Sequence, residues 1–217
     1  MRIVLRGRGS TEFNSLMYRW RCLNNEERER TLAWRQQRQR PLHSPKHLNH
    51  GQRHYLISAA CYEHAFHIGY SVERMNQFAA ALLDQFDRNG HGVAGWVVLP
   101  NHYHVLISCS NVHAVLKMIG QLHGRTSFQW NGEENTRGRK VWYNAAETVM
   151  KSVEHHYATL NYIHHNAVKH GYVPKWEDWP WSSASEYLGE LGRDEARRLW
   201  LSYPIDQYGE GWDDAAM

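Results

Sequence analysis

Residues 93–109 read VAGWVVLPNHYHVLISC, and this stretch decides the fold class. Two runs rich in β-branched and aromatic residues, Val93–Leu99 and Tyr103–Cys109, flank the dipeptide Pro100-Asn101. Such runs are typical of strands, and a proline followed by an asparagine is typical of a turn. The stretch therefore predicts two neighbouring strands joined through a short turn.

Outward from these strands, the hydrophobic pattern alternates between strand and helix. We expect a strand at His54–Glu63, a helix at Val72–Phe86, the two strands above, a helix at Val112–Gln129, a short strand at Val141–Tyr143 and a long helix at Ala145–His170. Gly171 after the last helix is a typical stop signal. The order β-α-β-β-α-β-α predicts an α+β fold, a ferredoxin-like antiparallel sheet with an added C-terminal helix.

Charge divides the chain into a basic beginning and a mildly acidic body. Residues 1–55 carry 12 Lys/Arg and 4 Asp/Glu, a balance of +8, whereas residues 56–217 carry 13 and 18, a balance of −5. We predict a basic, partly flexible arm over residues 1–50, one folded domain over 51–187 and a C-terminal tail over 188–217. A basic arm suits a polyanionic partner, although a solvated leader explains the same charges. Its arginines Arg35, Arg38 and Arg40 are candidates for contacts with a nucleic-acid backbone or groove.

Cysteine usage and hydropathy exclude several classes of protein. Cys22, Cys61 and Cys109 lie far apart with no CxxC pair, so a disulfide scaffold or a thiolate zinc site is not expected. The best apolar run, Val93–Leu99, is too short to span a bilayer, and residues 1–13 lack the apolar segment of a signal peptide. We therefore expect a cytoplasmic protein that does not associate with membranes.

His102 and His104 are the strongest candidate site in the sequence. Side chains alternate between the two faces of a strand, so these two imidazoles share one face while Tyr103, Val105 and Ile107 share the other. Two imidazoles on one rigid strand can chelate a divalent metal without ordering of a loop. Because the chain has 16 His, a pair of surface histidines is the alternative interpretation.

A second polar pattern lies on the predicted C-terminal helix. Tyr162, Asn166 and Lys169 are spaced by four and three residues, so they neighbour one another on a helix surface. They would bring a phenol, an amide oxygen and a cation within reach of one phosphate. We expect this stripe to lie roughly opposite the apolar stripe that packs the helix, which comprises Val149, Val153, Leu160, Ile163 and Ala167. An ordinary amphipathic helix is again the alternative.

These segments together resemble the IS200/IS605-like single-tyrosine (HUH) transposases. PNHYHVLI at 100–107 is similar to their histidine-hydrophobic-histidine motif. YIHHNAVKHGYV at 162–173 and WEDWPWSSASEY at 176–187 resemble the C-terminal signature of the REP-associated tyrosine transposase branch. PLHSPKH at 41–47 and YLISAACYEH at 55–64 resemble the start of one branch, so the resemblance covers roughly residues 41–187.

The resemblance implies DNA transposition by metal-dependent nicking and joining of single-stranded DNA, through a 5′-phosphotyrosine and on repeat-associated hairpins. Tyr162 would be the nucleophile, and Mg²⁺ or Mn²⁺ would be held by His102, His104 and Asn166. Lys169 would steady the phosphate, and a monomer or a homodimer is expected. The sequence departs from the pattern at Ala167, where such proteins usually have proline. Alanine is the better helix former and can lengthen the helix.

Three other functions stay open on the sequence alone. A domesticated protein could bind hairpin DNA without cleaving it. A metal-dependent hydrolase could use the histidine pair with His164 or His165, and His165 is also an alternative third ligand for the nickase. An RNA-binding module of the same fold would need surface aromatics on its sheet. Tyr103, Tyr143, Tyr157 and Tyr172 are the rival tyrosines.

Overall fold

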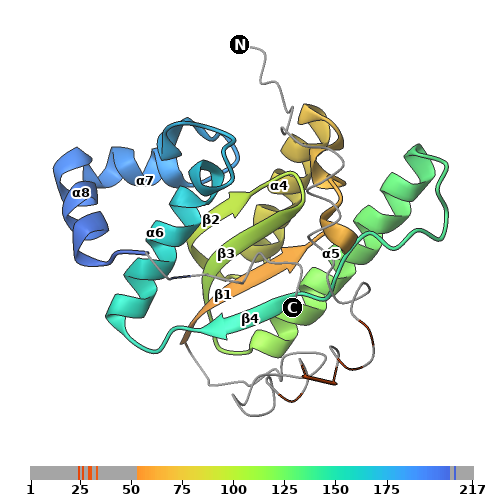
Figure 1. Ribbon diagram of the computed structural model, residues 1–217, viewed down its shortest axis with the longest axis horizontal. Helices are drawn as coiled ribbons and strands as arrows, with labels where there is room; N and C mark the ends of the chain where they lie inside the picture. Colours follow the sequence, from red (N-terminus) through yellow and green to blue (C-terminus); the bar gives the residue numbers. More distant parts are fainter. Residues whose placement is uncertain are drawn as a thin grey trace.

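The computed structural model describes residues 53–205, Tyr208 and five residues of the arm, which are Asn24, Glu26, Glu29, Arg30 and Ala33. Its centre is a four-stranded antiparallel sheet in the order β2-β3-β1-β4 (Figure 1). The strands are β1 (Arg53–Ala60), β2 (Gly92–Val98), β3 (His102–Cys109) and β4 (Ala146–Val149). Arg35, Arg38 and Arg40 lie outside the described residues.

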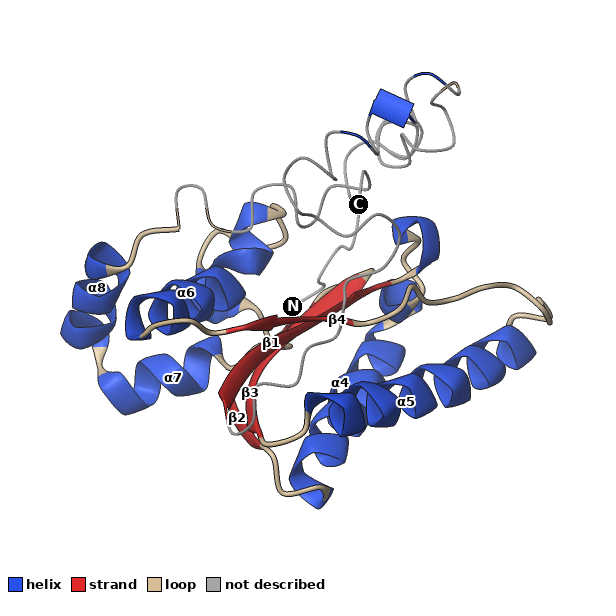
Figure 2. Ribbon diagram, turned by 90° about the horizontal axis from the view of Figure 1, so that it is seen from below, coloured by secondary structure: helices blue, strands red, loops and turns tan. Residues whose placement is uncertain are grey.

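Helices cover both faces of the sheet. The helices are α4 (Val72–Arg88), α5 (Val112–Glu133), α6 (Val153–Lys169), α7 (Ala184–Leu191) and α8 (Arg193–Ser202), with short 3-10 turns η1 (Tyr62–His64), η2 (Ile68–Tyr70) and η3 (Trp176–Asp178). Figure 2 shows α4 and α5 together on one side of the sheet, and α6, α7 and α8 on the other. None of the described helices is long and apolar enough to cross a membrane.

The core between the sheet and α4/α5 is largely aromatic. Phe78 of α4 stacks on Trp142, with 5.2 Å between the ring centroids, and it also contacts Tyr103 of β3 at 5.6 Å. Trp130 of α5 packs against Phe78 at 5.8 Å. Large aromatic side chains bury much apolar area each, so this cluster fixes the position of both helices on the sheet.

The predicted elements before residue 140 are confirmed to within a few residues, but the next segment differs. Residues 141–143 form only an isolated bridge, Cys61 to Trp142, and the fourth strand is β4, within the predicted long helix. The β-branched Thr148 and Val149 pair with β1, which suits extended backbone. Helix α6 begins only after Ser152, whose side chain accepts a hydrogen bond from the His155 amide as an N-cap.

The C-terminal end of the described body is folded. The predicted tail at 188–217 includes the last turn of α7 and all of α8. The Asn161 side chain of α6 donates to the carbonyl oxygens of Leu199 and Tyr203, at 3.3 and 2.8 Å. Residues 188–203 therefore pack as a cover over the outer side of α6.

His123 gives the fold a pH dependence. Its ring stacks on Trp142, with 4.1 Å between centroids, and burial lowers its pKa to about 3. The unfolded chain takes up a proton near pH 6.5 whereas the folded protein does not until about pH 3. The free energy of unfolding is therefore highest above pH 6.5 and should fall between pH 6.5 and 3, by about 1.4 kcal/mol per pH unit from this group.

Urea unfolding of the wild type and His123→Gln at pH 7.5 and pH 5 measures this contribution. Glutamine does not titrate, so the variant should lose less stability on acidification than the wild type. An equal loss in both proteins would show that His123 is not held neutral in the fold.

Candidate functional site

The two histidines of β3 lie on the face of the sheet that α6 covers. Their side chains are 5% and 3% exposed, with 5.3 Å between the ring centroids of His102 and His104. Tyr103 between them is fully buried on the opposite side, as its spacing predicts. The interpretation of the pair as surface histidines is therefore wrong.

Helix α6 places one polar side chain opposite each histidine. The phenol oxygen of Tyr162 lies 3.3 Å from Nε2 of His104, and Oδ1 of Asn166 lies 3.1 Å from Nε2 of His102. Four residues advance about 6 Å along a helix, and two residues advance about 6.6 Å along a strand. The spacing of the helix pair thus matches the spacing of the strand pair, and the two meet in register.

The predicted orientation of α6 is wrong. Tyr162 and Asn166 do not lie opposite the packing face, because they are 1% and 0% exposed against the sheet. Val153 of the expected apolar stripe is 62% exposed instead, whereas Ile163 and Ala167 are fully buried. The sheet lies on one side of α6 and the C-terminal helices on another, so burial extends around most of the helix and apolar periodicity does not mark a single face.

Asn101 fixes the protonation pattern of His102. Its Nδ2 donates to the carbonyl oxygen of His64 at 3.1 Å, so its Oδ1 is the atom that faces Nδ1 of His102 at 2.7 Å. An amide oxygen only accepts, so Nδ1 of His102 carries the proton and Nε2 carries a lone pair. Ser58 Oγ similarly lies 2.7 Å from Nδ1 of His104. Hydrogen bonds of this kind orient histidines that bind metals.

The resulting donor set fits a divalent cation. The lone pair of His102 Nε2 faces Oδ1 of Asn166, so two electron-rich atoms lie 3.1 Å apart in a buried site. Neighbouring ligands of an octahedral ion at about 2.1 Å are about 3 Å from each other. Nδ2 of Asn166 is buried without a hydrogen-bond partner, so the amide is not oriented by its nitrogen. No three His, Cys, Asp or Glu of the described residues form a metal cluster, and the candidate set is therefore two imidazoles and one amide.

Cationic and aromatic groups surround the phenol. Nζ of Lys169 lies 5.2 Å from the ring centre of Tyr162, and its side chain is exposed at the end of α6. The His170 ring packs 5.0 Å from that of His102. Tyr208 packs 5.6 Å from the Tyr162 ring and hydrogen-bonds to Thr159. Sequence reasoning missed His170, which follows Tyr162 at a helical spacing of eight, and Tyr208, for which the sequence holds no signal.

The rival residues point elsewhere. His164 hydrogen-bonds to Ser183 Oγ at 2.9 Å, and burial lowers its pKa to about 4. The His165 ring packs on Trp200 of α8, 5.0 Å away. Among the rival tyrosines, Tyr103 lies in the core, Tyr157 stacks on Tyr203 and Tyr172 packs on Trp179. The fourth, Tyr143, packs against Tyr62. The structure thus brings Asn166, and not His165, to the histidine pair.

Comparison with known proteins gives a curated relative and a solved structure that are both REP-associated tyrosine transposases. No family model matches the chain. The REP-associated tyrosine transposase of Escherichia coli (strain K12) is 31% identical over 124 residues, which are 57% of this chain and 67% of that protein. A solved REP-associated tyrosine transposase bound to a REP hairpin superposes with a TM-score of 0.53 at 18% identity, over 77% of this chain and 92% of that chain. At this identity the superposition shows the fold alone, and it confirms the predicted α+β fold.

The Asn101 contact predicts the tautomer of His102. In the wild type, long-range ¹H–¹⁵N NMR should show His102 protonated at Nδ1. In Asn101→Ala the acceptor is gone, so both tautomers should be populated, while Ser58→Ala should alter His104 and leave His102 unchanged. A wild-type His102 protonated at Nε2 would contradict the assigned hydrogen-bond pattern.

Proposed function

Because the chain belongs to the family of REP-associated tyrosine transposases, we propose that it nicks and rejoins single-stranded DNA with Tyr162 as its nucleophile. The observation that carries this proposal is the paired placement on α6 and β3. A phenol lies 3.3 Å from one buried imidazole, and an amide oxygen lies 3.1 Å from the next.

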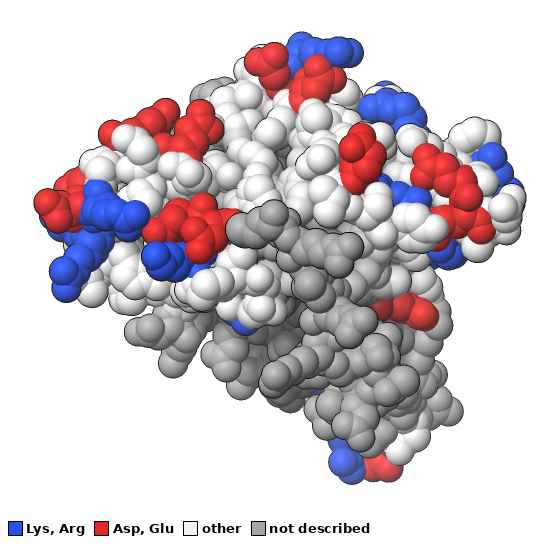
Figure 3. Space-filling model, turned by 90° about the horizontal axis from the view of Figure 1, so that it is seen from above, with Lys and Arg blue, Asp and Glu red and all other residues white. Residues whose placement is uncertain are grey.

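The proposed substrate is DNA that folds into repeat-associated hairpins. The solved relative is bound to a REP hairpin, which supports this choice. On the face of the body that Figure 3 shows, Lys and Arg lie beside Asp and Glu, and they form no continuous basic surface among the described residues. Residues 1–55, which include the arm and carry a balance of +8, would then supply most of the contacts to phosphates, through Arg35, Arg38 and Arg40 among others.

We further propose that His102, His104 and Asn166 hold a divalent metal ion, Mg²⁺ or Mn²⁺. When bound, such an ion polarises the scissile phosphate and stabilises negative charge on its oxygens. The neutral set of two imidazoles and one amide suits Mn²⁺ better by softness. Asn101 and Ser58 contribute by holding the imidazole rings in place through their Nδ1 atoms.

In the proposed reaction the Tyr162 phenol loses its proton and its oxygen attacks the phosphorus. The bond between phosphorus and the 3′ oxygen breaks, and this oxygen takes up a proton to become a free 3′-hydroxyl. The other product is a 5′-phosphotyrosine. In the joining step a 3′-hydroxyl attacks that phosphorus and the tyrosine leaves, so no ATP is needed. The cation of Lys169, 5.2 Å from the ring centre, attracts the incoming phosphate.

A covalent-adduct assay tests the nucleophile. The protein is incubated with Mn²⁺ or Mg²⁺ and labelled hairpin oligonucleotides that carry single-stranded tails, and is then run on a denaturing gel. The wild type and Tyr157→Phe, a control on the same helix, should give a shifted protein–DNA band. Tyr162→Phe should give none, because it lacks the attacking oxygen while keeping the ring that packs on His104.

A band that persists in Tyr162→Phe would assign the nucleophile to another residue. Tight hairpin binding by the wild type without any band would instead indicate a DNA-binding protein that does not cleave.

Mn²⁺ titration followed by electron paramagnetic resonance tests the third ligand without any reaction. Asn166→Leu should weaken Mn²⁺ binding about tenfold or more, because it removes the amide oxygen beside His102. His165→Leu is the matched control and should bind Mn²⁺ as the wild type does. The reverse result would place the third ligand at His165.

A further inference from the structure

Two tyrosines and a lysine lie next to the histidine pair and have no part in the chemistry described above. The rings of Tyr62 and Tyr143 are 5.0 Å apart between centroids. Nζ of Lys140 lies 4.6 Å from the centre of the first ring and 5.4 Å from the second. We call Tyr62, Tyr143 and Lys140 the aromatic edge.

Strand register places the aromatic edge beside His102. Ala60, the last residue of β1, pairs directly with His102, and the Tyr143 amide donates to the carbonyl oxygen of Ala60 at 3.0 Å. Cys61 and Trp142 form the next bridge and point into the core under α5. Since neighbouring side chains alternate between faces, Tyr62 and Tyr143 belong to the face that carries His102.

The turn that carries Tyr62 is held by hydrogen bonds, one of which comes from Asn101 beside His102. Tyr62 donates its amide to the carbonyl oxygen of Val141 at 2.7 Å, which joins the two parts of the aromatic edge. Glu63 and His64 adopt positive φ values of 54° and 50°, which non-glycine residues rarely do. Asn101 hydrogen-bonds to the carbonyl oxygen of His64 in this turn and to Nδ1 of His102. One side chain therefore holds both the turn and the imidazole.

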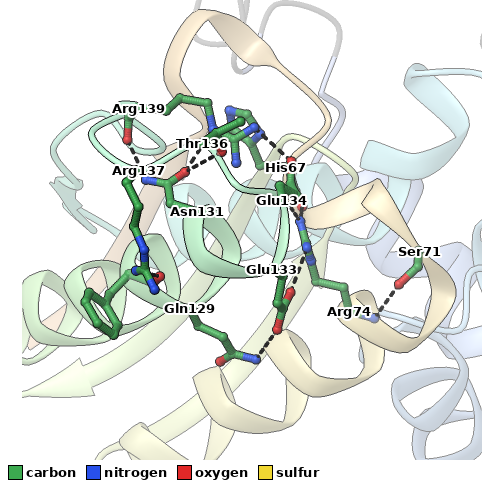
Figure 4. A network of polar contacts seen from close by, with 11 residues as sticks. His67, Ser71, Arg74, Gln129, Asn131, Glu133, Glu134, Thr136, Arg137 and Arg139 are labelled. Atoms are coloured by element: carbon green, nitrogen blue, oxygen red, sulfur yellow. Dashed lines mark hydrogen bonds and ion pairs between the residues drawn. The ribbon is translucent and has the colours of Figure 1, made fainter.

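A partly buried ion-pair network positions the segment before Lys140, which forms the other part of the aromatic edge (Figure 4). Arg74 of α4 is only 5% exposed and pairs with Glu133 and Glu134 at the end of α5, at 2.8 and 2.6 Å. Glu134 also pairs with Arg139 at 2.8 Å, and hydrogen bonds from Arg139 and then Arg74 lower the pKa of Glu134 to about 2. The network holds the segment that leads into Lys140, whose own side chain is exposed.

The charge of Lys140 is available to a ligand. Within residues 53–205 no carboxylate forms an ion pair with Lys140, in contrast to the neighbouring Arg139. Proteins that bind single-stranded nucleic acid combine aromatic rings, on which bases stack, with cations that contact the backbone. The aromatic edge has both components, and strand register places it beside a site proposed to act on a single DNA strand.

We propose that the aromatic edge binds the single-stranded nucleotides next to the scissile phosphate. A base stacks on the Tyr62 and Tyr143 pair, and Lys140 contacts the adjoining phosphate. This inference rests on the proposed function, because it takes the site at His102 as the place where the single strand is held. In this proposal the aromatic edge, and not the arm, positions the DNA strand.

Binding experiments in a Tyr162→Phe background test this role without cleavage. Hairpins with and without a single-stranded tail are compared, and each tail nucleotide in turn is replaced by 2-aminopurine, whose fluorescence is quenched on stacking. Tyr62→Leu and Tyr143→Leu should weaken binding of the tailed hairpin about tenfold each and abolish the quenching at one position. They should leave the tailless hairpin unaffected.

Three controls separate stacking from folding. Tyr143→Phe keeps the ring and should bind as the parent does. Phe128→Leu removes an exposed ring that also carries a cation, Arg137 at 4.2 Å, but lies on α5 outside the edge, and it should have no effect. An abasic nucleotide at the quenched position should weaken the parent about as much as Tyr62→Leu does. Lys140→Gln should lower tail affinity at low salt and make it less salt-dependent.

Equal tail affinity in Tyr62→Leu and its parent, or equal losses for tailed and tailless hairpins, would overturn the inference. The outcome is distinguishable from failure of the proposed function. If the wild type forms no covalent adduct while tail binding still depends on the two rings, then the nicking proposal fails and the aromatic edge stands. If adducts form without any dependence on the rings, the aromatic edge alone is wrong.

Discussion

The site depends on the burial of two imidazoles between a central strand and a helix. Strand β3 has neighbours on both sides and helices on both faces, so its side chains are enclosed whichever way they point. Buried polar groups without partners are costly, and both ring nitrogens of His104 and Nδ1 of His102 accordingly have hydrogen-bond partners. Ser58 of β1 and Asn101 of the turn bond to the Nδ1 atoms. Helix α6 places the Tyr162 phenol at Nε2 of His104 and Oδ1 of Asn166 at Nε2 of His102. The position of α6 is thus coupled to the orientation of both histidines.

Sequence reasoning predicted what depends on local periodicity and missed what depends on tertiary packing. The shared face of His102 and His104 follows from a period of two, and the adjacency of Tyr162 and Asn166 follows from a spacing of four, so both could be read directly. The direction of α6 could not, because a helix covered on several sides has no single apolar face. The position of β4 was also missed, since Thr148 and Val149 gain strand structure by pairing with β1 and have little pattern of their own. Ser58 is aligned with His104 only by the register of two strands 46 residues apart.

The side chain of Asn101 connects two parts of the chain, the turn at His64 and the imidazole of His102. One side-chain amide bonds to a strained turn through its nitrogen and to a histidine through its oxygen. A change in the position of either group therefore moves the other, since an amide has its donor and acceptor at a fixed angle. This geometry links the turn after β1 to the start of β3, although the two segments are far apart in the chain. Periodicity carries no information about such a link, although an asparagine in a turn next to a histidine is a local signal for it.

The departure at Ala167 also has a structural consequence. A proline at an interior helix position lacks the amide hydrogen of the helical ladder and bends or ends the helix. Alanine keeps that hydrogen, and α6 continues to Lys169 before Gly171, with φ of 72°, ends it. The Tyr172 amide then returns to the Ala167 carbonyl at 2.9 Å and the Gly171 amide to Val168 at 2.9 Å, which is the Schellman pattern. The last turn thereby presents Lys169 at the C-terminal end of the helix, where a cation is favoured by the helix dipole, and within 5.2 Å of the Tyr162 ring. Because the helix continues past Ala167, the Lys169 ammonium lies close to the Tyr162 phenol.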